Sequence, residues 1–248
     1  MSKVLWNLYA HGYDAIAGLA PYRDMLDEVV DSLDLAPGMR VLDAGCGTGA
    51  LAERAAIACP DVEWVGVDLS ATMLKRARRR QRWPDGFRFV EANLDDFLDQ
   101  GQVGFDRIAS VNVIWTLPDP AATLSRMAKA LRPTGRMVHT TPRLRFNFQR
   151  IVWAHLARQR GWARVRAALG LPLLALVGLL NLVLVAQSML SRARHRRERW
   201  DARGLEELLR KAGSSVRTVR PCYVGQGHLL VCEQDTGPSP LPPPAKGL

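Results

Sequence analysis

The chain has 248 residues, long enough for one α/β domain with insertions to bury its own core. Lysine and arginine outnumber the acidic residues by 34 to 24, for a net charge of +10. The four cysteines, Cys46, Cys59, Cys222 and Cys232, show no Cys-x-x-Cys spacing. They therefore suit a reducing compartment and argue against both a disulfide framework and a zinc site, so we expect no metal. The N-terminal residues lack an apolar core ahead of a small-residue cleavage site, and we expect no secretory signal there.

The positive charge is concentrated in one part of the sequence. Residues 143–217 contain 16 basic residues against 4 acidic ones, a balance of +12. The rest of the chain contains 18 basic residues against 20 acidic ones, a balance of −2. The strongly basic part also contains the most apolar segment of the chain.

Strand and helix patterns alternate along the first 142 residues. Apolar residues at helical spacing and turn residues predict helices over 22–33, 50–58, 70–79 and 120–131. Strands are predicted over 40–43, 62–68, 87–91, 107–111 and 136–140, and the candidates for two further strands are 215–219 and 228–233. Repeated units of this length predict a doubly wound, mostly parallel, seven-stranded Rossmann-like α/β sheet. A hydrophobic, basic-flanked helical insertion would precede the last two strands.

The most informative motif is the run Val-Leu-Asp-Ala-Gly-Cys-Gly-Thr-Gly over residues 41–49. A short apolar strand runs into Asp43 and then into three glycines at alternate positions. Glycines let the backbone approach a nucleotide-like ligand at the carboxyl end of a strand. Asp68 ends the next strand, 19 positions after Gly49, where a carboxylate can accept hydrogen bonds from both hydroxyls of a ribose.

These residues resemble the class I methyltransferases that use S-adenosyl-L-methionine. The segments VLDAGCGTG, VGVDLSATMLKRAR, FRFVEANLDDF and SVNVIWTLPDPAATLSRMAKALRPTGRMVHTTP extend the resemblance over roughly residues 36–142. The chain is similar to the branch that methylates quinones and other small or lipophilic molecules. A nicotinamide-binding Rossmann fold shares the strand, the glycines and the ribose acid. Its glycine spacing is Gly-x-Gly-x-x-Gly, however, and the later segments fit only the methyltransferases.

The resemblance implies a role for several residues in holding S-adenosylmethionine. Gly45, Gly47 and Gly49 would let the backbone approach the amino-acid end of the donor, and Asp43 would meet its ammonium, directly or through water. Asp68, with Leu69 beside it, would hold the ribose. The remaining implied contacts are Asn93 and Leu94 at the adenine and Asn112 where methyl group and acceptor meet.

No residue stands out as a catalytic base. An Asn-Pro-Pro-Tyr motif is absent, and the candidates for proton removal are His11, Tyr13, His139 and the surroundings of Trp115. Asn112, together with His139 and Tyr13, is a candidate catalytic residue, although its amide is not a base. Each of these also fits a plain packing role. An amine or an already acidic hydroxyl would need no base during methyl transfer. Tyr9 and Tyr13 fit either a lid over the donor, as in relatives of the family, or an aromatic helix packed on the core.

Residues 169–190 form a stretch of 22 residues without a charge, flanked on both sides by arginines. As a helix it would be about 33 Å long, enough to cross a hydrocarbon core of about 30 Å. Strands of one sheet precede and follow the segment, so both of its ends must lie on the same side of any membrane. We therefore expect either an in-plane or re-entrant element that binds an anionic membrane through residues 158–199, or a buried lid or dimer helix. We expect no nucleic acid partner.

Together these observations predict a methyltransferase that acts at the cytoplasmic membrane face on a lipid or lipophilic acceptor, attached peripherally or monotopically. One alternative is a soluble small-molecule methyltransferase whose insertion is a lid or dimer interface. The other is a non-catalytic, donor-binding membrane scaffold. The predicted organisation is N-terminal lid helices at 1–35, a donor-binding core at 36–142, the basic insertion at 143–212, the final strands at 213–235 and a disordered proline-rich tail at 236–248.

Overall fold

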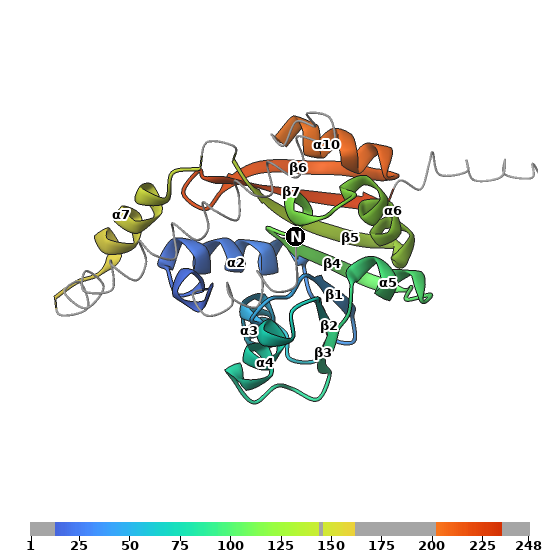
Figure 1. The fold of residues 1–248 in the computed structure, drawn as a ribbon, viewed down its shortest axis with the longest axis horizontal. Coiled ribbons are helices and arrows are strands. Elements are labelled where there is room, and N and C mark those ends of the chain that lie inside the picture. The colour runs from blue at the N-terminus through green and yellow to red at the C-terminus, as the bar shows by residue number, and fades with distance from the viewer. Residues whose placement is uncertain (1–12, 144–145, 162–201, 235–248) are drawn as a thin grey trace, which may run out of the picture.

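A computed structural model of the chain describes residues 13–143, 146–161 and 202–234 (Figure 1). Seven strands form one sheet in the order β3-β2-β1-β4-β5-β7-β6. The strands are β1 (Arg40–Ala44), β2 (Glu63–Asp68), β3 (Phe87–Glu91), β4 (Phe105–Val111), β5 (Leu131–Pro142), β6 (Ser214–Cys222) and β7 (Gly227–Gln234). Only β7 runs antiparallel to its neighbours in this sheet of the described residues. The predicted doubly wound, mostly parallel, seven-stranded α/β fold is confirmed.

The strand order reverses between β1 and β4. From β1 the chain builds outward through β2 to β3, and from β4 it builds in the opposite direction through β5. Asp43 of β1 lies in register with Gly66 of β2 on one side and Ala109 of β4 on the other. In open α/β sheets a ligand binds in the crevice outside the carboxyl ends of the strands at such a reversal. The fold therefore directs attention to the residues that follow β1, β2 and β4.

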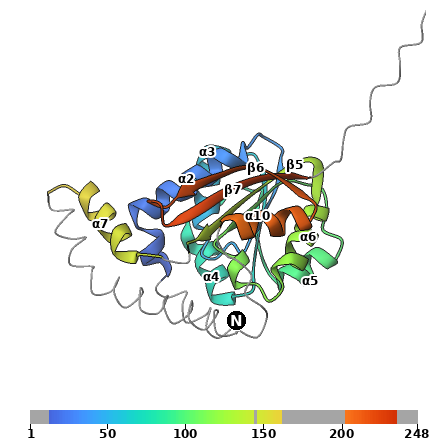
Figure 2. The same cartoon turned by 90° about the horizontal axis from the view of Figure 1, so that it is seen from above.

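Helices cover both faces of the sheet (Figure 2). The first face carries α2 (Ala20–Leu33), α3 (Ala50–Ala58) and α4 (Ala71–Arg80), and α7 (Phe148–Arg158) extends from the body of the molecule beside α2. The second face carries α5 (Leu94–Asp99), α6 (Pro120–Ala130) and α10 (Ala202–Lys211).

Neighbouring strand residues alternate between these two layers because successive side chains of a strand point to opposite faces. Val41 and Ala109 therefore pack in the first layer, whereas Leu42 and Ile108 pack in the second.

Several helix starts follow from local chemistry. The Ser70 hydroxyl accepts a hydrogen bond from the Met73 backbone N–H at the start of α4. Asp119 caps α6 in the same way by accepting from the Ala122 N–H, and Pro120 occupies the first turn of that helix.

The structure differs from the predicted elements most clearly at strand β5 and helix α10. Strand β5 begins at Leu131 rather than at 136, because Leu131 pairs with Phe105 before a shift in register that leads to the pair Arg107 and Arg136. The helix α10 lies within residues 143–212, the range predicted as an insertion, yet it packs Leu205 and Leu209 into the second layer of the core. Helices α5 and α7 were not foreseen.

Three predicted segments lie largely or wholly outside the described residues. These are the apolar segment 169–190, the proline-rich tail 236–248 and the first twelve residues of the predicted N-terminal lid. Within the described ranges, no helix combines the length and the apolar character needed to cross a bilayer. The predicted organisation of the chain into segments stays a prediction.

Candidate active site

The turn between β1 and α3 has the backbone geometry that its glycines predict. Gly45, Gly47 and Gly49 have φ values of +76°, +54° and +77°, a left-handed conformation that favours glycine. At Gly45 a Cβ atom would lie 2.4 Å from Cγ2 of Val113, so no other residue fits there without a shift. At Gly47 the nearest heavy atom to such a Cβ is Tyr13 Cε1, at 3.8 Å. The space above Gly47 is thus bounded by a tyrosine ring rather than by backbone.

Asp43 is a buried acid with one oxygen that lacks a hydrogen-bond partner among the described residues. Its side chain is 2% exposed, and its Oδ2 atom accepts no hydrogen bond within the described residues. Burial, and next the nearby charge of Asp68, raise the pKa of Asp43 to about 8. A buried carboxylate of this kind favours a cation that would restore its charge. The small hollow beside it is lined by Tyr13, Tyr22, Gly45 and residues of α2 and α3.

Asp68 ends β2 and is tied to the glycine turn. Its Oδ2 accepts the Gly47 backbone N–H at 2.9 Å, and its Oδ1 accepts the Ser70 N–H at 2.8 Å. Burial raises the pKa of Asp68, and these backbone donors offset part of that effect. Leu69, next in the chain, is half-buried. The two predicted cofactor acids, Asp43 and Asp68, are therefore brought together on either side of the glycine turn.

Asn112 follows β4 in a left-handed conformation, with φ of +57°. Its backbone N–H donates to the Thr140 carbonyl at 3.1 Å, and its Oδ1 accepts the Thr140 hydroxyl at 3.3 Å. Left-handed asparagine carries mild strain that concentrates at functional sites. The residue lies at the carboxyl end of β4, on the edge of the sheet that also carries Asp43.

Asn93 and Leu94 do not lie in an open loop. Asn93 is the N-cap of α5, and its Oδ1 accepts the Asp95 backbone N–H at 2.9 Å. Leu94 begins the helix and packs against the second layer of the core. The side-chain oxygen of Asn93 thus already accepts one hydrogen bond from the helix, and its second lone pair and its amide nitrogen are left for the predicted contact with an adenine.

Tyr13 covers the glycine turn. Its hydroxyl lies 2.5 Å from the Tyr22 hydroxyl, and the two rings meet edge to face at 6.2 Å. Burial, and then the charges of Tyr22, Asp68 and Asp43, raise the pKa of Tyr13 well above its usual value. A tyrosine with a raised pKa is a poor base at neutral pH. Its position over Gly47 agrees better with a covering role than with proton removal.

An arginine missed at the sequence level connects this cover to the turn. Arg80 of α4 donates to the Thr48 carbonyl at 2.8 Å and to the Thr48 hydroxyl at 2.9 Å. The same guanidinium pairs with Asp14 at 2.7 Å and with Glu53 at 3.0 Å. Arg76 adds a second ion pair to Asp14. Local patterns could not reveal this cluster, because Asp14 and Arg80 are 66 positions apart.

His139 lies away from the glycine turn. It shares the second face of the sheet with Met137, and it is fully buried between β4 and β7, in register with Ser110 and Leu230. Burial lowers its pKa to about 4, so the imidazole is neutral at physiological pH. Both ring nitrogens and the Ser110 hydroxyl lack hydrogen-bond partners within the described residues.

Three other residues singled out in the sequence are Trp115, His11 and Tyr9. Trp115 lies in a short 3-10 helix, Ile114–Thr116, after β4. His11 and Tyr9 lie outside the described residues. All four cysteines are free and buried, and the described ranges contain no group of three or more potential metal ligands.

A family model described as a methyltransferase domain matches residues 35–166, more than half of the chain. The chain therefore belongs to the methyltransferase domain family. The predicted class, the class I methyltransferases with S-adenosylmethionine as their cofactor, is confirmed.

One curated relative is the ubiquinone biosynthesis O-methyltransferase of Aromatoleum aromaticum. It is 33% identical over 124 residues, which are 49% of this chain and 51% of the relative. The chain spans about half the length, or less, of the curated relatives that it matches.

Solved structures of low identity share the fold. A TehB-like SAM-dependent methyltransferase from Corynebacterium glutamicum superimposes with a TM-score of 0.55 at 17% identity, covering 94% of this chain and all of the other. The (4+2)-cyclase SpnF superimposes with a TM-score of 0.58 at 16% identity, covering 87% of this chain and 82% of the other. A protein named as a methyltransferase and one named as a cyclase share this architecture. The fold alone therefore does not define a reaction, and the residues of the site must do so.

Proposed function

We propose that this protein transfers a methyl group from S-adenosylmethionine to a lipophilic small molecule or lipid at the cytoplasmic face of a membrane. The observation that carries the donor part is Asp43, a buried acid with an unpartnered oxygen beside three left-handed glycines. An ammonium group would supply the positive counter-charge that lets this buried acid ionise. A donor could approach the backbone of Gly47 beneath the Tyr13 ring only because no side chain occupies that position.

The remaining predicted contacts follow from the same edge of the sheet. Asp68 would accept the ribose hydroxyls with the lone pairs that the Gly47 and Ser70 N–H groups leave free. Asn112 would face the reacting methyl group from the end of β4. Tyr13 would cover the donor and exclude water, with Asp14 fastened to Arg80 beneath it.

When bound, the donor supplies an electrophilic methyl group on a sulfonium, so the protein mainly has to position it and keep water away. Asp43, Asp68 and the glycine turn hold one end of the site. The described residues near the methyl position offer no strong base, since Tyr13 has a raised pKa and His139 lies on the other face of the sheet. An acceptor with an amine or an acidic hydroxyl suits this site best.

The proposed membrane location rests on the sequence of residues 158–199 and on the relatives. The uncharged segment 169–190 is flanked by arginines, a pattern typical of interfacial elements. One relative is named as an enzyme of ubiquinone biosynthesis, which supports a lipophilic acceptor.

The test is incubation of the purified full-length protein with donor carrying a radiolabelled methyl group and total membrane lipid, followed by chromatography of the products. We expect label in a lipid-soluble product, and calorimetry should show that the protein binds the donor. Donor binding without turnover on any extract would favour the non-catalytic scaffold. Label confined to water-soluble acceptors would favour the soluble methyltransferase instead.

A further inference from the structure

Exposed apolar side chains gather around α7. Among the described residues six large apolar side chains are strongly exposed, and three of them, Phe146, Trp153 and Val224, lie on or beside this helix. They are 40%, 67% and 46% exposed. The other three belong to separate elements, and single exposed apolar residues are ordinary on protein surfaces. A cluster that contains an exposed tryptophan needs a physical reason.

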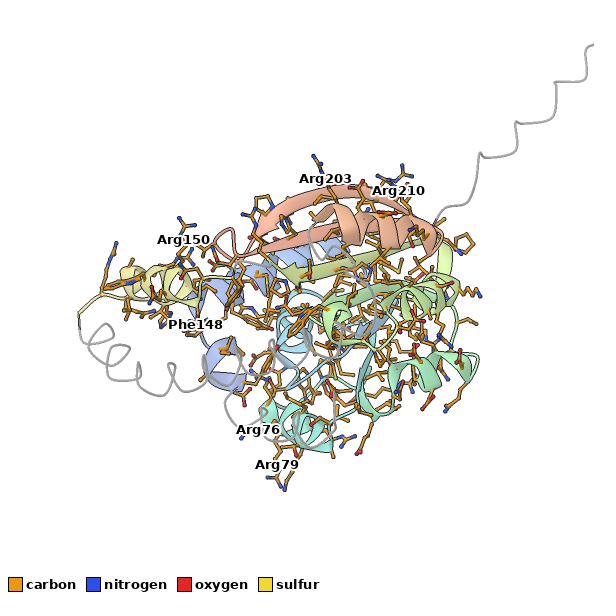
Figure 3. The ribbon with its side chains drawn as sticks, turned by 45° about the horizontal axis from the view of Figure 1, so that its top comes forward. Arg76, Arg79, Phe148, Arg150, Arg203 and Arg210 are labelled. Carbon is orange, nitrogen blue, oxygen red and sulfur yellow. The ribbon has the colours of Figure 1, made fainter. Side chains whose placement is uncertain are left out.

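Helix α7 has an inner and an outer face. On the inner face Ile151 and Leu156 are buried, and His155 Nδ1 accepts the Ala20 backbone N–H at the start of α2, at 3.1 Å. On the outer face Arg150, Trp153 and Ala157 follow one another at spacings of three and four residues and are all exposed. Figure 3 shows Arg150 pointing away from the body of the molecule.

The outer face is held firmly in place. The buried Gln226, in the turn between β6 and β7, accepts the Arg143 N–H through its backbone carbonyl and the Asn147 N–H through its side chain, both at 2.8 Å. In the same turn Tyr223 and Val224 are both left-handed, with φ of +53° and +56°. This conformation is strained for a β-branched residue, and Val224 is exposed in it, while the ring of the preceding Tyr223 contacts that of Phe146.

The part of the sequence that contains α7 carries basic residues without acidic ones. Residues 143–197 contain no aspartate or glutamate. Arg143, Arg150 and Arg160 are exposed and form no salt bridge within the described ranges. Arg158 differs, because it pairs with Asp24 and is thereby held against α2.

We propose that Phe146, Arg150, Trp153, Arg160 and Val224, together called the α7 face, dock on an anionic lipid bilayer. Tryptophan favours the level of the headgroups, and arginines beside it pair with anionic phosphates. An uncharged stretch at 169–190 follows α7 in the chain, which favours lipid over nucleic acid or a second copy of the protein. This inference rests on the proposed function. It adds residues of the folded domain to the segment 158–199 as the part of the protein that contacts the membrane.

An aromatic path leads from the α7 face to the candidate site. The Phe146 ring lies 5.9 Å from that of Tyr223, which meets Tyr22 at 5.6 Å, and Tyr22 meets Tyr13 at 6.2 Å. Tyr13 in turn covers Gly47. Docking through the α7 face would therefore bring the aromatic wall of the site next to the bilayer, where a lipophilic acceptor resides.

A cysteine label tests this contact directly, because the four native cysteines are buried. An Ala157→Cys variant of the full-length protein, labelled with an environment-sensitive dye, would be mixed with vesicles of phosphatidylcholine containing about one quarter phosphatidylglycerol. We expect a blue shift that salt weakens, and none from a dye placed at Ile57→Cys, an exposed apolar position on α3. The double variant Arg150→Ala/Trp153→Ala should partition onto these vesicles at least about tenfold more weakly than the wild type.

The matched control is the double variant Arg203→Ala/Ile57→Ala, which removes an exposed arginine of α10 and an exposed apolar residue of α3 (Figure 3). It should bind vesicles as the wild type does. A dye at position 157 that ignores vesicles to which the protein binds would overturn the proposal. A dye that shifts on adding duplex DNA or unlabelled protein without lipid would also overturn it. Donor binding by calorimetry reports on the proposed function separately, since both double variants leave the donor site intact.

Discussion

The carboxyl end of β1 and the α7 face differ in whether their charged residues are buried or exposed. At the first, two acids lie close together and buried, and neighbouring arginines are consumed by ion pairs such as Arg80 with Asp14. At the second, Arg143 and Arg150 are exposed, without a salt bridge in the described part of the chain. A buried acid without a counter-charge favours a small cationic ligand that lets it ionise. Charge left exposed beside a tryptophan favours an extended surface.

The two regions also differ in how they are encoded. The glycine turn is local, since nine consecutive residues place Asp43 and the three glycines. The α7 face depends on contacts distant in sequence, such as Gln226 with Asn147. The first region is therefore recognisable in a sequence, whereas the second is recognisable only in a structure.

The largest effect is expected from Gly47→Val. A Cβ atom there would meet no protein atom closer than Tyr13 Cε1, at 3.8 Å, so we expect the valine side chain to occupy the space assigned to the donor. Calorimetry should detect no donor binding, because the valine methyl groups would keep the donor from the backbone. We expect donor affinity to fall about a hundredfold or more. The fold should survive, as seen in the circular dichroism spectrum.

Gly38→Val is the matched control for this change. Gly38 has φ of +77° and open space around it, so valine brings the same backbone strain of about 1–2 kcal/mol far from the turn. Equal donor binding by Gly47→Val and the wild type would refute the pocket assignment. Loss of binding in both variants would mean that strain, and not occupied space, is responsible.

Asp43→Asn should weaken donor binding by about ten- to a hundredfold, because the amide cannot neutralise an ammonium group. The same change should stabilise the free protein. Burial raises the pKa of Asp43 to about 8, so the folded state holds a proton that the unfolded state has lost. The free energy of unfolding of the wild type must therefore fall as the pH rises from about 4, the ordinary pKa of aspartate, to about 8.

Thermal unfolding of both proteins across that pH window measures the effect. The gap between the melting temperatures of Asp43→Asn and the wild type should widen from acid toward neutral pH. Calorimetry in two buffers of different ionisation enthalpy should also show that the wild type releases a proton when it binds the donor, and that the variant does not. A constant gap in melting temperature would show that Asp43 is ionised and already paired.

Much of the fold was predictable because its signals are local. Strand β3 was predicted with both bounds, and β1 and β2 each differ at one end only. The two acids and the glycines could be found because strand, turn and helix follow each other within a few residues. Their assigned contacts with the donor stay predictions, although the structure brings these side chains together.

The features of the fold and site that could not be predicted depend on contacts between residues far apart in the sequence. No local pattern shows that Arg80 reaches both Thr48 and Asp14, or that Asn93 spends its side-chain oxygen on the start of α5. Residues 202–211 fell within the range predicted as the basic insertion, and helix α10 was not foreseen there. Its burial follows from the faces of β6 and α6 on which Leu205 and Leu209 pack.

Asp68→Ala should weaken donor affinity by about tenfold or more. Two charge-assisted hydrogen bonds to a ribose are worth about 1.5–3 kcal/mol each, and part of that is recovered by water in the variant. Asp68→Asn keeps one acceptor oxygen and should fall between Ala and the wild type in titration calorimetry. Since Asp68 also fixes the Gly47 N–H, an Asn variant that binds the donor as weakly as Ala would indicate that the turn, rather than the ribose contact, was lost.

The smallest effect is expected from Arg80→Ala, which separates the cover of the site from its floor. Arg80 is the residue that holds Asp14 and Thr48 together, so its loss should loosen the segment around Tyr13 without touching Asp43 or Asp68. Donor affinity should fall only about two- to fivefold, in the range of a partly exposed ion-pair network. Hydrogen exchange of the amides around residues 14–18 should become faster.

Arg79→Ala is the control, because Arg79 is exposed on the same helix and points away from the site (Figure 3). Unchanged exchange in Arg80→Ala would show that Tyr13 and Tyr22 alone hold the cover closed, and the aromatic path from the α7 face would then be its main support.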